Sequence, residues 1–165
     1  MSEEYSALKN HFLKIFRHMK WADIRVIKLL EEENISSGKA VELISHVIIT
    51  EDIYFKRITN EYYDNKFWNV LTLEECRRIV DDTNQKFIDY ILNLTEKNFQ
   101  NKISYKNSRG VDYNTSIEDM LSQVALHGMY HRGQIMVQMR NSGHNITETD
   151  YVLYTREVEL GEAKL

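Results

Sequence analysis

Two histidines four residues apart, His127 and His131, have the residue type and spacing to bind a metal ion. In a helix, side chains at this spacing leave the same face with Cβ atoms about 6 Å apart, so two imidazoles can reach one ion. The three residues between them, Gly128, Met129 and Tyr130, lack the glutamate that acts as general base in H-E-x-x-H proteases. The pair alone is weak evidence of a metal site, and it argues against a metalloprotease.

A third histidine, His46, lies among Ile44, Val47 and Ile48 in an earlier periodic segment. An imidazole buried there needs a polar partner. Three mid-helix histidines could converge on one ion, or each could donate to a backbone carbonyl or a carboxylate as an ordinary core residue. Spacing alone leaves both interpretations open.

Apolar residues recur at steps of three and four in four segments, which predicts four long helices. The segments cover about residues 4–33, 39–63, 72–97 and 115–141, and capping boxes are expected at Thr72 with Glu75 and at Thr115 with Glu118. Between residues 99 and 115 the period changes, which indicates a short β-hairpin or an ordered loop. A short helix is expected over 148–157. We therefore expect an all-α four-helix bundle with a hairpin or loop insertion before the fourth helix, in one domain spanning 1–165.

Composition narrows the classes of function. The 165 residues are 42% hydrophobic and 28% charged, with a net charge of −4 and no basic stripe, so nucleic acid is not an expected partner. No stretch could cross a bilayer and the first residues lack an apolar signal region, so we expect a cytoplasmic protein with no membrane partner. The single cysteine, Cys76, excludes internal disulfides and thiolate clusters, and its position predicts a small buried apolar residue.

The segment from His127 to Gln134 reads H-G-M-Y-H-R-G-Q and resembles the H-x-x-x-H-R-x-Q segment of the DinB family of small helical metalloproteins. Trp21-Ala22-Asp23, the place of His46, and Gly143 followed by Asp150-Tyr151 are similar to that family as well. The resemblance implies three metal ligands, which are His46, His127 and His131. Two departures, Asp23 where the family usually has asparagine and Tyr130 before the last ligand, concern the substrate pocket.

Three imidazoles suit zinc or nickel, and also iron or cobalt, and they leave a coordination position for water or substrate. Hydrolysis and thiol transfer are both open to such a site. The resemblance favours metal-dependent S-transfer from a bacillithiol-type or related small thiol to an electrophile bound against Trp21, Tyr54 or Tyr130. It also implies a homodimer. No general base is assigned.

The alternative class is a non-catalytic stress-response or interaction protein with a structural metal, in which an aromatic turn containing Tyr62, Tyr63, Phe67 and Trp68 could pair two copies. We expect Glu51 to be a solvated carboxylate or one beside the ligands, not a fourth ligand. Arg132 is expected to pair with a carboxylate of a neighbouring helix, which Gly133 would allow to approach closely. Three histidines without partner spacing are expected at the surface or at caps: His11, His18 and His144.

Overall fold

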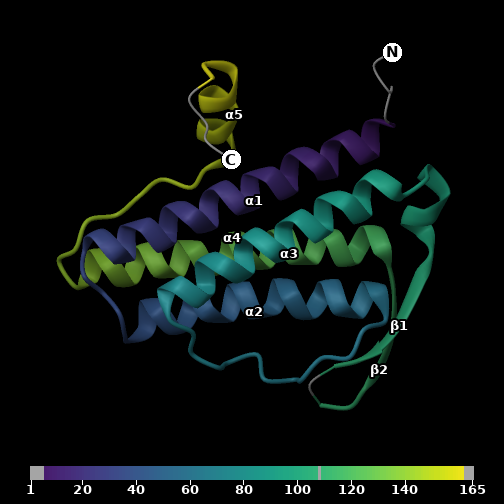
Figure 1. Cartoon of the computed structure of the whole chain (residues 1–165), viewed down its shortest axis with the longest axis horizontal. Coiled ribbons are helices and arrows are strands. Elements are labelled where there is room, and N and C mark those ends of the chain that lie inside the picture. The colour runs from purple at the N-terminus through teal and green to yellow at the C-terminus, as the bar shows by residue number, and fades with distance from the viewer. Residues whose placement is uncertain (1–5, 108, 162–165) are drawn as a thin grey trace.

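The computed structural model describes residues 6–107 and 109–161, and four long helices lying side by side make up most of it (Figure 1). They are α1 (Ala7–Glu32), α2 (Lys39–Thr59), α3 (Leu73–Asn93) and α4 (Ile117–Asn141). A 3₁₀ turn, η1 (Glu96–Gln100), and an antiparallel hairpin of β1 (Lys102–Lys106) and β2 (Asp112–Ser116) connect α3 to α4. A short helix, α5 (Tyr151–Glu159), packs outside α1. The expected helical class and the hairpin before the fourth long helix are confirmed.

The helix ends follow local chemistry, with corrections to the sequence prediction that include the end of α3, which is Asn93 instead of a residue near 97. Thr72 and Glu75 form the predicted capping box at the start of α3. The cap of α4 is Ser116, whose hydroxyl accepts from the backbone N–H of Asp119. Thr115 is not the cap because the helix begins at Ile117, one residue later than expected, which makes Ser116 the residue before its first turn. The second helix ends at Thr59, four residues earlier than expected, because Asn60 adopts a left-handed backbone conformation with φ of 58°.

Most of the core forms two hydrophobic clusters at opposite ends of the long helices, and a third, small cluster joins α1 to α5. One cluster joins the first half of α1 and of α4 to the second half of α2 and of α3, and the other cluster joins the remaining halves. The helices α1 and α4 therefore run parallel to each other and antiparallel to α2 and α3. Between the clusters lie buried polar side chains, among them Asp23, Glu51 and Arg132. Among the described residues, no helix is both long and apolar enough to cross a membrane.

Candidate metal centre

The structure brings together the three histidines that the sequence singled out. His46 comes from the middle of α2, and His127 and His131 come from successive turns of α4. Their ligand atoms all lie within 4.8 Å of one another, and the Nε2 atoms of His46 and His127 are 3.1 Å apart. Three nitrogens at this separation could hold one metal ion.

Two of the histidines have hydrogen bonds that fix their tautomers. His46 Nδ1 lies 2.8 Å from the carbonyl oxygen of Phe67, and a carbonyl can only accept, so Nδ1 carries the hydrogen. His131 Nδ1 donates in the same way to Gln134 Oε1 at 2.7 Å. Both Nε2 atoms are then free of hydrogen and can ligate, with the second ring nitrogen oriented as in most metal-binding histidines.

His127 makes a close contact with His46 that fits either a hydrogen bond or a shared cation. Without a cation, its Nε2–H would have to be donated to His46 Nε2, and Nδ1 would become an acceptor. That Nδ1 atom is buried and has no hydrogen-bond partner among the described residues. A cation shared by the two Nε2 atoms would replace the hydrogen between them, and Nδ1 would then carry the hydrogen and need an acceptor.

Burial lowers the pKa of His127 to about 3, and the nearby positive charges of His131 and His46 add to this effect. Burial also lowers the pKa of His46. Both imidazoles are therefore neutral at neutral pH, which is the form that binds metals.

The loop between α2 and α3 forms part of the site. The indole of Trp68 stacks on the imidazole of His46, with ring centroids 3.8 Å apart and planes 3° from parallel. Lys39 Nζ lies 5.4 Å from the centre of the same indole. Sequence reasoning identified Phe67 and Trp68 only as members of an aromatic turn, because no periodic pattern connects a loop residue with a helix that lies 21 residues earlier.

A shallow pocket of about 580 Å³ lies between α2 and α4, and although none of the three histidines lines it, two of its lining residues contact His131. It is lined by Gln134, which holds His131, and by Tyr130, whose exposed ring lies 5.1 Å from that of His131. The other lining residues are Lys39, Leu43, Gly133, Val137 and Gln138. A small molecule in this pocket would lie beside the histidine cluster, and of the three expected pocket residues Tyr130 is the one found here.

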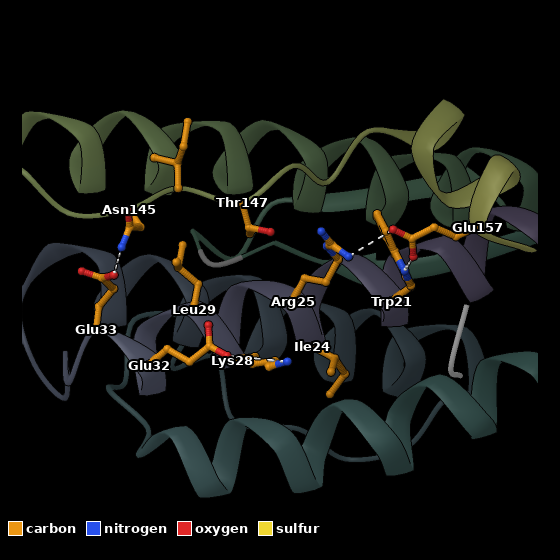
Figure 2. Close-up of a pocket in the computed structure, with 11 residues that line it drawn as sticks. Trp21, Ile24, Arg25, Lys28, Leu29, Glu32, Glu33, Asn145, Thr147 and Glu157 are labelled. Carbon is orange, nitrogen blue, oxygen red and sulfur yellow. Dashed lines mark hydrogen bonds and ion pairs between the residues drawn. The ribbon is translucent and has the colours of Figure 1, made fainter. Parts of the chain in front are cut away.

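The two other expected pocket residues lie elsewhere. Trp21 lines a separate pocket of about 620 Å³ between α1, residues 145–147 and α5, and none of the three histidines lines it (Figure 2). Its Nε1 donates to Glu157, and Arg25 lies over its ring (Figure 2). Tyr54 packs at the edge of the hydrophobic core with the Arg57 guanidinium over its ring.

Beside the histidines lies the buried polar layer. Arg132 Nη1 donates to Asp23 Oδ1 of α1 at 2.8 Å, which confirms the predicted pairing with a neighbouring helix. Glu51 is 4% exposed, so it is not solvated. The close approach occurs at Gly128, where an added Cβ would lie 2.8 Å from Arg132 Nη1, whereas an added Cβ at Gly133 would meet nothing within 4 Å.

The remaining histidines agree only in part with expectation. His11 is exposed, and His144 is partly exposed and pairs with Glu33 after the end of α4. His18 is buried, which corrects the surface prediction, because its Nε2 reaches the carbonyl oxygen of Thr149 at 2.8 Å and thereby satisfies the imidazole inside the fold.

Two comparisons with known proteins gave a match. The family model described as the DinB family matches residues 6–162. A curated protein, Protein DinB of Bacillus subtilis (strain 168), is 38% identical over 66 residues. That alignment covers 39% of this chain and 38% of the length of the relative.

Proposed function

The chain belongs to the DinB family, and from this premise we propose that it is a metal-dependent thiol S-transferase that acts on electrophilic small molecules. One divalent ion, zinc or nickel in the first place and iron or cobalt otherwise, would be held by His46, His127 and His131 in a four-helix bundle. The observation that carries the proposal is the convergence of these histidines, within 4.8 Å, beside an open pocket.

A divalent cation with three histidine ligands would lower the pKa of a bound thiol and supply a strong nucleophile at neutral pH. In the transfer, a bond forms between the thiol sulfur and the electrophilic carbon. The departing group, or the atom at the far end of a double bond, takes the electron pair, and the thiol proton is released. Small thiols of the bacillithiol type carry carboxylates, for which Lys39, paired with Glu42 at the edge of the pocket, could exchange its partner.

The protein's own residues have orienting tasks in this proposal. The Phe67 carbonyl and Gln134 hold the rings of His46 and His131 with Nε2 directed toward the common centre. Trp68 and Tyr130, which are 58% and 64% exposed, offer aromatic faces to an electrophile beside the histidines.

Metal analysis tests the binding site first. Purified protein without a polyhistidine tag should contain near one metal per chain after dialysis against zinc. His46→Ala and His131→Ala should lose the metal, and His144→Ala, which changes a histidine paired with Glu33, should keep it. Absence of metal from the wild type, or retention in both site variants, would contradict the proposed centre.

Cobalt-substituted protein distinguishes thiol transfer from a structural metal site and from hydrolysis. A titrated thiol should produce a sulfur-to-metal charge-transfer band if the centre admits thiols. A closed structural metal, as in an interaction protein, would give no band. A hydrolase would give no thiol-dependent product and would cleave an activated ester instead.

We also propose a homodimer that forms through α4. Between Met120 and Met139 this helix exposes no acidic or basic side chain apart from histidine, since Arg132 is buried, and it exposes Leu126, Met129, Tyr130 and Val137. A surface that lacks charged side chains and exposes aromatic and methionine side chains is typical of interface cores. Sedimentation should show a dimer that Val137→Lys dissociates and that Val152→Lys, on exposed α5, leaves intact. A monomeric wild type would refute this part of the proposal.

A further inference from the structure

Three ionisable side chains form a compact buried cluster between the two hydrophobic halves of the core. Asp23 of α1 is 0% exposed, Glu51 of α2 is 4% exposed and Arg132 of α4 is 1% exposed. Two carboxyls and one guanidinium would carry a net charge of −1 if all were ionised. Burying an uncompensated charge costs several kcal/mol in a protein interior.

The unpaired atoms of this cluster favour an additional proton. Arg132 Nη1 donates to Asp23 Oδ1 at 2.8 Å. The buried atoms Asp23 Oδ2, Glu51 Oε1 and Arg132 Nε have no hydrogen-bond partner among the described groups, and each carboxyl lies close enough to the other to shift its pKa. Two ionised carboxylates have only acceptors, so a hydrogen bond between Asp23 and Glu51 requires that one of them carry a proton.

We propose that Asp23 and Glu51 share one proton, carried by Glu51, and that this acid pair and Arg132 form a neutral unit that positions the histidine-bearing turns of α4 against α2. The proton belongs on Glu51 because Arg132 pairs directly with Asp23 and stabilises its ionised form. Carboxyl pairs that share a proton in this way are known where two acids meet in one site.

The surrounding charges are consistent with this assignment. Burial raises the pKa of Glu51 well above its ordinary range, and the adjacent Asp23 charge raises it further. Two other titratable groups interact electrostatically with Asp23, namely His18 of α1 and the Cys76 thiol of α3. Burial lowers the pKa of His18 and raises that of Cys76 to about 11, so both are neutral at neutral pH.

The cluster is connected to the metal centre through the backbone. Gly128 follows His127 and Arg132 follows His131, and Glu51 lies five residues after His46. The Arg132 guanidinium and Glu51 Oε1 lie 2.8 Å and 3.4 Å from where a Gly128 Cβ would be. The neutral unit thus packs against α4 between its two ligands. Its positioning role rests on the proposed metal site, but the shared proton does not.

Infrared spectroscopy of the metal-free protein at neutral pH tests the proton. The wild type should show the C=O stretch of a protonated carboxylic acid, and Glu51→Gln should lack it. Asp52→Asn, which changes the next residue along α2 and disrupts a partly exposed pair with Lys56, should keep it. A wild type without this band, or a Glu51→Gln protein that keeps it, would overturn the proposal.

Zinc affinity and the cobalt absorption spectrum test the positioning role. Glu51→Gln still donates an N–H to Asp23 and should bind zinc with wild-type affinity. Glu51→Leu cannot donate and should bind zinc at least about 10-fold more weakly, with a changed cobalt spectrum. Wild-type affinity and spectrum in Glu51→Leu would refute the role. His46→Ala should lose zinc yet keep the carboxylic acid band, which separates failure of the metal site from failure of the acid pair.

Discussion

The imidazole of His46 lies flat on the indole of Trp68, 3.8 Å away between ring centroids, while the carbonyl of the preceding residue, Phe67, accepts a hydrogen bond from His46 Nδ1. One short loop segment therefore fixes the ring plane and the tautomer of this histidine. The free Nε2 atom is left pointing at His127. The helix α2 thus determines the position of this ligand, and the α2–α3 loop determines the orientation of its ring.

Removal of this stacking contact should weaken metal binding without destroying the fold. We expect Trp68→Ala to lower zinc affinity by about 10-fold, because groups that orient a metal-ligating histidine typically contribute 10- to 100-fold. Competition with a chromophoric chelator measures this change. Trp68→Phe should retain most of the affinity because a phenyl ring can still stack, and equal affinities in wild type and Trp68→Ala would show that the loop does not orient the ligand.

The helices and the histidine pair could be predicted because both depend on local periodicity. Apolar steps of three and four located the long helices, and a four-residue step placed His127 and His131 on one face. The pairing of Arg132 with a carboxylate was predictable because a guanidinium on an inward face needs a partner.

Contacts that depend on how helices and loops meet could not be predicted. The pattern gives no information on which glycine lies over Arg132, and the structure shows Gly128 instead of Gly133. The identity of the α4 cap depends on where the hairpin ends, and the cap is Ser116, the last residue of β2, instead of Thr115. The burial of His18 depends on a carbonyl 131 residues away.

Cys76 should be inert in the native protein. Its side chain is fully buried, and burial raises the pKa of the thiol to about 11, so almost no thiolate is present at neutral pH. We expect a disulfide reagent to label it only as fast as the protein opens, and rapidly and stoichiometrically in denaturing urea. Labelling of the folded protein at the rate of a free cysteine would contradict this expectation.

The metal-free protein should lose stability as the pH falls below about 6.5. His127 binds a proton near pH 6.5 in the unfolded chain but only near pH 3 in the fold, so acid favours the unfolded state across this interval. Above about pH 6.5 the imidazole is neutral in both the folded and the unfolded state, so this loss of stability is absent there. Urea unfolding at pH 7 and pH 5 measures it, and His127→Gln should show a smaller loss between these values. Parallel losses in the two proteins would assign the effect to other groups.

Two glycines of α4 provide a matched test of the packing around the buried cluster. In Gly128→Ala the new Cβ would lie 2.8 Å from a guanidinium nitrogen that is itself buried and paired with Asp23, so the guanidinium cannot simply move away. We expect a loss of about 1–3 kcal/mol in the free energy of unfolding. In Gly133→Ala the Cβ meets open space, and the better helix propensity of alanine should stabilise the protein by about 0.5–1 kcal/mol. Urea unfolding at neutral pH compares both with wild type. Equal effects of the two substitutions would show that Arg132 does not pack against the turn between the metal ligands.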